Sequence, residues 1–310
     1  MENDFTVGLR LRHQRDRRKK LIRAGIFIFV GVISIYLIFN QFNKTNNSTT
    51  KNTQVKISSL EETVGNALEG TKGTYAIAVK NLKTGEKYYL DEHRVFETGS
   101  LYKLWIMAVV YQQIQNGQLT EDQVLSEDVA TLNDKFNIDS DSAELTEGTI
   151  TFTVRDALNQ MITISHNYAA LLLTEQIKLS SVATFLKDKG FSESIVGTNG
   201  ESPTATASDI ALFYEKLYKG ELANKQYTDE MIGLLKNQQL NDGLPKYISD
   251  KSMVASKTGD IGWFKHDAGI VFTDRGDYII VIMSESDNPQ AAQERIALVS
   301  KAVFDYFANK

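Results

Sequence analysis

The most constraining feature of the chain is residues 101–117, a segment that is apolar on every side for three turns of a helix. It reads LYKLWIMAVVYQQIQNG. A surface helix carries one apolar stripe, whereas a helix that is apolar all round lies inside a protein. The segment therefore predicts a buried helix. Lys103 is its only charged residue, and a buried lysine needs a partner or a chemical role.

Strand and helix patterns surround this segment in a definite order. Two segments with period-two alternation come early and three further strand segments come late, and the short connections between the late ones indicate antiparallel neighbours. Amphipathic or well-capped helices are expected at both ends and in the middle, where Thr153 with Asp156 and Thr206 with Asp209 form capping boxes. We therefore expect an α/β fold: an antiparallel sheet of about five strands, flanked by terminal helices, with an inserted all-helical subdomain. The expected strands are 74–82, 86–92, 252–258, 267–273 and 278–284, and the terminal helices are 58–70 and 289–307.

The N-terminal region differs sharply in composition from the rest. Residues 1–23 carry eight Lys and Arg against three acids, and residues 24–39 contain no Asp, Glu, Lys or Arg. Because Lys and Arg collect on the cytoplasmic side, we expect a cytoplasmic tail at 1–20 and a transmembrane signal anchor at 21–40. A cleavable signal peptide is the alternative, but no small-x-small cleavage site follows the apolar run.

Residues 41–55 are rich in Asn, Thr, Lys and Gln and predict a flexible linker. We then expect residues 56–310 to form one domain outside the cell. With 24 Lys/Arg against 36 Asp/Glu, this domain has a net charge of −12, which would repel nucleic acid. The chain has no cysteine and only four histidines, none paired at metal-ligand spacing. We expect a monomer that uses neither a metal nor a cofactor.

Ser100 and Lys103 are three residues apart where the buried helix begins. Side chains at this spacing lie on one face of a helix. Burial and the helix dipole favour the neutral form of a lysine, which can then take a proton from a neighbouring serine. The alternative is that Ser100 only caps the helix. The spacing alone does not decide, because Ser48 and Lys51 repeat it in the predicted linker.

Two further motifs follow in order. Ser165, His166 and Asn167 fall in a break between two helical patterns, and residues 257–259, Lys-Thr-Gly, end a predicted strand. This ordered set resembles the serine penicillin-recognising enzymes and, more narrowly, the class A β-lactamase family. The resemblance covers 56–310 and implies the β-lactamase-like fold. A second Lys-Thr-Gly at 83–85 is interpreted as a hairpin turn, and a Ser-Asp-Asn at 286–288 as a helix cap.

The resemblance implies a role for each matched residue. Ser100 would attack the substrate carbonyl, Lys103 would accept its proton, and Ser165 would relay a proton to the leaving nitrogen. Backbone N–H groups of Ser100 and Asp260 would form the oxyanion hole. The substrate-binding residues would be Asn167, Lys257, Thr258 and Asp260.

The chain departs from the class A pattern at two places. His166 stands where those enzymes usually carry an aspartate. The loop that normally carries a Glu-x-x-x-Asn pattern for deacylation is about a dozen residues short. Glu201 is the possible substitute base, since Glu193 belongs to the preceding turn, and the alternative is that Glu201 is an ordinary exposed loop residue.

The sequence leaves three functions open. The first is a membrane-anchored serine hydrolase that β-lactams acylate and that hydrolyses the lactam amide, at either an ordinary or a slow rate. The second is a D-Ala-D-Ala peptidase acting on cell-wall peptides by the same acylation chemistry. The third is a penicillin receptor that is acylated without turnover. The short loop favours the second and third, because it removes the group that deacylation requires.

Overall fold

The computed structural model describes residues 59–197 and 201–310. The predicted tail at 1–20, anchor at 21–40 and linker at 41–55 lie outside these residues. Within the described part, no single helix is long and apolar enough to cross a membrane. One pair bent by 82°, Asn167–Ile177 with Leu179–Lys189, meets that test by length and composition only.

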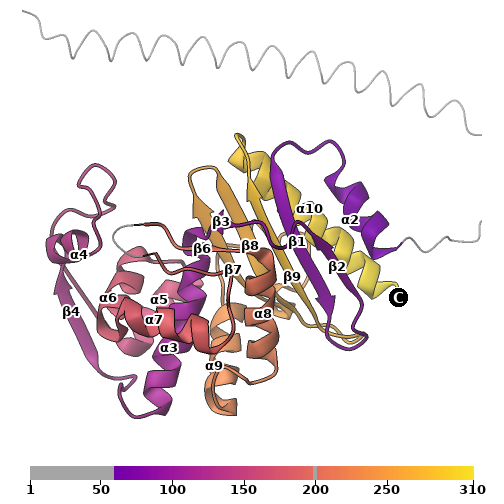
Figure 1. Ribbon diagram of the computed structural model, residues 1–310. Coiled ribbons are helices and arrows are strands. Elements are labelled where there is room, and N and C mark those ends of the chain that lie inside the picture. The colour runs from indigo at the N-terminus through magenta and orange to yellow at the C-terminus, as the bar shows by residue number, and fades with distance from the viewer. Residues whose placement is uncertain (1–58, 198–200) are drawn as a thin grey trace, which may run out of the picture. The chain divides into compact units, whose positions relative to one another are not determined.

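A five-stranded antiparallel sheet confirms the predicted strands (Figure 1). Its order is β2-β1-β9-β8-β7, so β7 is an edge strand. Residues 83–85 lie between β1 and β2, as predicted, with Gly85 at a φ of 75°. The strands are β1 (Thr74–Asn81), β2 (Lys87–Leu90), β7 (Val254–Ile261), β8 (Phe264–Val271) and β9 (Tyr278–Glu285).

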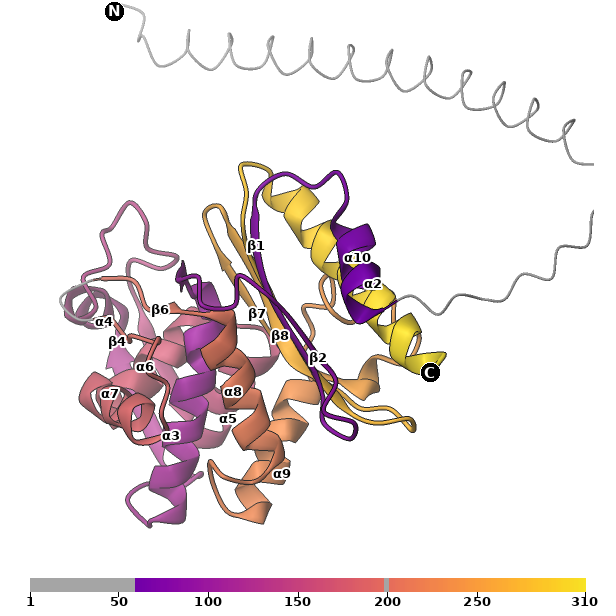
Figure 2. The ribbon, with the colours of Figure 1, turned by 45° about the vertical axis from the view of Figure 1, so that its right-hand side comes forward.

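Both faces of the sheet are covered, and the alternation of side chains along β1 shows how. Tyr75, Ile77 and Val79 pack on one face against α2 (Leu60–Leu68) and α10 (Pro289–Ala308), the two terminal helices. Ala76 and Ala78 belong to the other face, which packs against the helical part of the chain (Figure 2). Burial on both faces explains why β9 is a nearly continuous apolar run.

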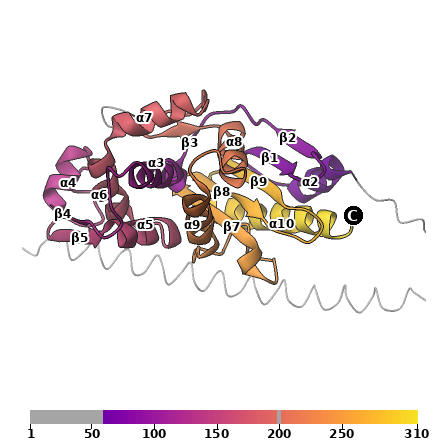
Figure 3. The same ribbon diagram turned by 90° about the horizontal axis from the view of Figure 1, so that it is seen from below.

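The segment 101–117 does form the buried central helix. It contains α3, Lys103–Gln115, of which every residue from Lys103 to Tyr111 is buried. Figure 3 shows α3 nearly end-on, with α5, α6 and α7 around it. The other helices of this part are α4 (Val129–Lys135), α5 (Val154–Thr163), α6 (Asn167–Ile177), α7 (Leu179–Asp188), α8 (Ala207–Tyr218) and α9 (Lys225–Lys236).

The prediction that the inserted subdomain is all-helical was wrong. It contains an antiparallel pair, β4 (Val124–Asp128) with β5 (Thr149–Thr153), and a short pairing of β3 (Phe96–Glu97) with β6 (Thr204–Ala205). The sequence of β5, TITFT, is rich in β-branched and aromatic residues that favour strands. Its partner lies about twenty residues earlier, so no hairpin signal joins the two.

The predicted helix caps are confirmed. Thr153 accepts from Asp156 N–H at 3.1 Å, and Thr206 accepts from Asp209 N–H at 3.2 Å. The Ser-Asp-Asn at 286–288 caps α10 as expected, because Asn288 Oδ1 accepts from the Ala291 N–H at 3.1 Å.

Candidate active site

The site is assembled where the edge strand β7 meets η1, a 3₁₀ turn at Gly99–Tyr102 that precedes α3. A side chain could not fit between them. A Cβ on Gly99 would lie 2.6 Å from Asp260 N, and one on Gly259 would lie 2.5 Å from the Thr98 carbonyl oxygen. Gly99 also has a φ of 49°, which glycine adopts without strain. Ser100 therefore lies within a 3₁₀ turn beside β7, and not at the cap of α3.

The outer edge of β7 carries a backbone N–H group that faces η1 near Gly99. Ile261 and Phe264 close the two-residue turn between β7 and β8. In such a hairpin the closing pair exchanges hydrogen bonds, and the next residue along the strand points its N–H away from its partner. The N–H of Asp260 therefore points out of the sheet on the side where η1 packs. This placement fits the predicted oxyanion hole.

Lys103 is wholly buried, and its side chain is held by the second motif. Its Nζ donates to the Ser165 carbonyl oxygen and to Asn167 Oδ1, both at 2.6 Å, and lies 3.2 Å from Ser165 Oγ. Burial lowers the pKa of Lys103 to about 6, with the nearby charge of Lys257 acting in the same direction and Glu144 opposing it. A neutral amine can keep its two short hydrogen bonds and still offer a lone pair to a proton.

Ser165 is the meeting point of two buried lysines. Lys257 Nζ donates to Ser165 Oγ at 3.0 Å, so this oxygen lies within 3.2 Å of both amines. Burial lowers the pKa of Lys257 to about 7, and the carboxylate of Asp267 opposes this shift. Ser165 has a φ of 60°, in the left-handed region that is uncommon for a residue with a side chain. The break between α5 and α6 thus supplies a strained turn that places this hydroxyl between the amines.

Asp267 was not singled out from the sequence. Its negative charge acts to raise the pKa of Lys257 and so favours the charged form of that lysine. Asp267 lies on β8 opposite Thr258 and is wholly buried. Its Oδ2 accepts from the Leu244 N–H at 2.7 Å, and burial raises the pKa of its carboxyl to about 7. A signal did exist, since an aspartate inside the apolar strand pattern of 267–273 is costly to bury without a partner.

Asn167 begins α6 and connects the lysine to a carboxylate that the sequence did not reveal. Its Oδ1 accepts from Lys103, and its Nδ2 donates to Glu144 Oε1 at 2.5 Å. Glu144 lies in the connection between α4 and β5. No local pattern distinguishes it from other acidic residues of that connection, because its position depends on contacts far along the chain.

The remaining predicted residues lie at the rim of this cluster. Ser100 and Thr258 are half-buried, and the exposed Asp260 carboxylate pairs with Lys265. Within the described residues, the Ser100 hydroxyl makes no hydrogen bond, so no side chain competes for it. Thr258 borders a cavity of about 370 Å³ along the outer edge of β7, with Lys265 on the same wall.

Glu201 lies apart from the lysine cluster. It is exposed and lines a cavity of about 270 Å³ together with Tyr102, the residue before Lys103. Among the described residues it has no hydrogen bond to the cluster. Glu193 is structural as predicted, because it pairs with His93 at 3.0 Å and accepts from the Thr206 hydroxyl at 2.8 Å.

His166 has a structural role in the turn. It is the N-cap of α6, where its Nδ1 accepts from the Ala169 N–H at 3.1 Å, and burial lowers the pKa of its imidazole. A capping acceptor must be deprotonated, which the lowered pKa favours. An aspartate could cap the helix in the same way, so the departure from the class A motif preserves the local geometry.

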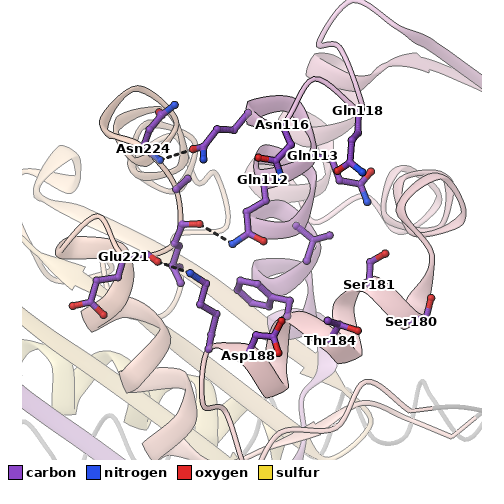
Figure 4. A pocket seen from close by; sticks show the side chains of 16 residues that line it. Gln112, Gln113, Asn116, Gln118, Ser180, Ser181, Thr184, Asp188, Glu221 and Asn224 are labelled. Carbon is purple, nitrogen blue, oxygen red and sulfur yellow. Dashed lines mark hydrogen bonds between the residues drawn. The ribbon is translucent and has the colours of Figure 1, made fainter.

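A cavity of about 850 Å³ lies at the far end of α3, away from all the predicted catalytic residues. Figure 4 shows that carboxamides near the end of α3 face hydroxyls of α7 across it. Part of its lining is already bonded: Gln112 donates to the Leu222 carbonyl oxygen at 2.8 Å, and Lys189 donates to the Glu221 carbonyl oxygen at 2.7 Å. None of the predicted catalytic or substrate-binding residues lines this cavity.

The chain matches the β-lactamase enzyme family over residues 59–307. The chain belongs to the β-lactamase enzyme family. This confirms the resemblance that the three motifs predicted, and the described domain has the family's α/β serine hydrolase fold. No match is found among curated protein sequences.

Solved structures of this fold include close geometric matches at low identity. The β-lactamase from Sphaerobacter thermophilus DSM 20745 has a TM-score of 0.70 and 22% identity, over 81% of this chain and 97% of that one. PBP-A has a TM-score of 0.71 and 21% identity, over 81% and 96%. A PBP-A mutant captured as an acyl-enzyme complex with penicillin G gives 0.71 and 22%, over 81% and 96%. At this identity the likeness supports the fold alone.

Proposed function

We propose that the chain is a serine hydrolase of the class A β-lactamase type that β-lactams acylate at Ser100. The observation that carries this proposal is the convergence of two wholly buried lysines, Lys103 and Lys257, on the hydroxyl of Ser165. Packing alone does not favour two buried amines around one serine, because each ammonium is costly to desolvate. A proton-transfer chain beside a nucleophile accounts for both.

The chemistry runs through these contacts. The Ser100 hydroxyl attacks the lactam carbonyl and gives its proton to Lys103, and the N–H groups of Ser100 and Asp260 stabilise the oxyanion. When the lactam C–N bond breaks, the nitrogen takes a proton from Ser165. Ser165 regains one from Lys103, whose Nζ lies 3.2 Å from its oxygen. Lys257 and Thr258 hold the substrate carboxylate, and Asn167 holds the side-chain amide. The product is an ester at Ser100.

Acylation should have a bell-shaped dependence on pH. The rate should fall as pH drops through about 6, because Lys103 becomes protonated and cannot act as a base. It should also fall as pH rises through about 7, because Lys257 loses the charge that attracts the carboxylate. Because the two lysines interact, the apparent pKa values of the two limbs of the pH profile belong to the pair of lysines and not to either residue alone. The second-order rate of labelling by a fluorescent penicillin measures the profile. A flat profile between about pH 5 and about pH 9 would contradict these roles.

Hydrolysis of the ester should be slow. Deacylation needs a base that positions water, worth about 10²–10⁴-fold in rate, and the connection from α7 to α8 lacks the Glu-x-x-x-Asn pattern. Glu201 is the candidate base, acting through water in the cavity it shares with Tyr102. We expect a long-lived penicilloyl enzyme. Glu201→Gln should lengthen its lifetime and leave its rate of formation unchanged, with both rates followed by intact mass. Fast, multiple-turnover hydrolysis that survives Glu201→Gln would contradict the assignment.

A second candidate function is a D-Ala-D-Ala peptidase acting on cell-wall peptides. The short α7–α8 connection favours it, and so does the fold similarity to PBP-A, whose mutant forms an acyl-enzyme with penicillin G. Either function suits a domain held outside the cell by an anchor at 21–40, which we also propose. Release of D-alanine from a D-Ala-D-Ala peptide, compared with hydrolysis of penicillin, separates the two.

A further inference from the structure

His266 is a buried histidine on β8 that takes no part in the chemistry proposed above. Its Nε2 lies 2.7 Å from the Glu97 carbonyl oxygen, and its Nδ1 lies 3.1 Å from the backbone nitrogen of Ser284 on β9. A carbonyl oxygen can only accept a hydrogen bond, and a backbone N–H can only donate one. His266 is therefore the neutral tautomer that carries its proton on Nε2 and donates it to Glu97.

The surroundings keep this imidazole neutral. Burial lowers the pKa of His266 to about 4, while its hydrogen bonds to the backbone of Glu97 and Lys265 and the charge of Asp260 oppose this shift. The ring packs edge-on against Phe96, with the two ring centroids 5.8 Å apart. Since this pKa lies below the pH range in which acylation is expected, the same tautomer holds Glu97 throughout that range.

The peptide group that His266 holds ends two residues before the nucleophile. It is a single planar unit, and it is bonded at both ends. The Glu97 carbonyl oxygen accepts from His266, and the Thr98 N–H donates to the Pro203 carbonyl oxygen at 2.9 Å. The start of η1, and with it the backbone of Ser100, is therefore fixed from the sheet on one side and from the α7–α8 connection on the other.

His266 also contacts the strand that carries the other half of the predicted oxyanion hole. It pairs with Gly259 across β7 and β8, and a Cβ on Gly259 would lie 3.1 Å from the imidazole ring. The next residue along β7 is Asp260, whose N–H faces η1. One side chain thus contacts both β7 next to Asp260 and the segment that leads to Ser100.

We propose that His266 is a positioning residue of the oxyanion hole, which sets the separation of the Ser100 and Asp260 N–H groups. It does so by holding the peptide group of Glu97 and Thr98 against β7. The inference rests on the proposed function, because it takes those two N–H groups as the donors to the oxyanion. Such donors act at about 2.7–3.1 Å from the oxyanion, and a misplacement of about 1 Å can cost about 10²-fold in rate.

Two substitutions of similar length separate the hydrogen bond to Glu97 from the other contacts of the ring. Glutamine can place an N–H donor where the Nε2 of His266 lies, whereas methionine cannot donate. We measure acylation of the full chain by intact mass over a range of benzylpenicillin concentrations. In His266→Met the rate at saturation should fall about 10²-fold. The concentration that gives half of this rate should change by less than about twofold, since Lys257 and Thr258 still bind the carboxylate.

His266→Gln should be acylated within about threefold of the rate of the unchanged protein, because it restores the donor to Glu97. Gln112→Met is the matched control, since it also leaves a backbone carbonyl, that of the buried Leu222, without its side-chain donor. Its rate should not change. Equal rates in His266→Met and His266→Gln would overturn the positioning role. So would a smaller labelled fraction of His266→Met at an unchanged rate, which marks a residue that only stabilises the fold.

Nitrogen NMR of the imidazole provides a test that does not depend on the folding of His266→Met. The signals are assigned by their loss in His266→Gln. We expect a proton on Nε2 and none on Nδ1 from about pH 5 to about pH 8. A proton on Nδ1 in place of Nε2 would remove the bond to Glu97 and overturn the proposal. Absence of acylation in the unchanged protein, or an adduct away from Ser100, would instead contradict the proposed function and leave the tautomer of His266 as it is.

Discussion

Ser100→Ala should abolish covalent labelling by penicillin and leave the fold intact. The substitution removes the hydroxyl of the one serine in the 3₁₀ turn Gly99–Tyr102, which packs against β7. Stability should change by less than about 1 kcal/mol, because the Ser100 hydroxyl is half-buried and makes no hydrogen bond in the described structure. Gel fluorescence after mixing with a fluorescent penicillin measures labelling, and the thermal midpoint measures the fold.

The chain offers a matched control for this substitution. Ser48 precedes Lys51 with the same spacing as Ser100 and Lys103. Ser48→Ala should label like the unchanged protein, since the spacing acts only where the rest of the site surrounds it. Undiminished labelling of Ser100→Ala, or attachment of the label to Ser165, would show that the nucleophile has been misassigned.

Lys103→Ala should slow acylation by about 10²–10⁴-fold, the contribution of a general base. The loss has two sources. Ser100 loses its proton acceptor, and both Asn167 Oδ1 and the Ser165 carbonyl lose a donor at 2.6 Å. Lys103→Arg separates them, because arginine can still donate hydrogen bonds but stays protonated and cannot act as a base.

Lys103→Ala and Lys103→Arg should therefore both be acylated slowly. In both variants the fall in acylation rate below about pH 6 should disappear, because the group that titrates there is gone. Second-order labelling rates over a pH series measure this, with Lys51→Ala as the control of equal spacing. A rate for Lys103→Arg close to that of the unchanged protein would mean that the residue acts through its hydrogen bonds alone. The proton must then go elsewhere.

The sequence predicted the parts of the fold that local patterns determine. The strand alternation in 74–82 and the all-round apolar character of 101–117 correctly placed β1 and α3. The pair β4 and β5 was missed, because a strand pairing across some twenty residues depends on tertiary contacts that leave no periodic signal. The 3₁₀ turn at Gly99–Tyr102 was missed for a related reason, since close approach to Gly259 determines it.

The candidate site was predictable to a similar degree. The ordered motifs identified Lys103, Ser165 and Lys257 correctly as residues that meet, because the chemistry restricts the residue types and the family resemblance supplies their order. Glu144 could not be found, since only the fold brings it to Asn167. The base for deacylation stays a prediction, because Glu201 lines a cavity beside Tyr102 without reaching the cluster.

The most direct test of acylation at Ser100 is mass spectrometry of the full chain after mixing with benzylpenicillin. Samples are quenched over time, and each is analysed intact and after digestion. We predict rapid gain of one penicilloyl group, its location on the peptide that contains Ser100, and slow return to the unmodified mass. A chain that gains no mass while its thermal unfolding shows an intact fold would contradict the central claim, as would an adduct on any other residue.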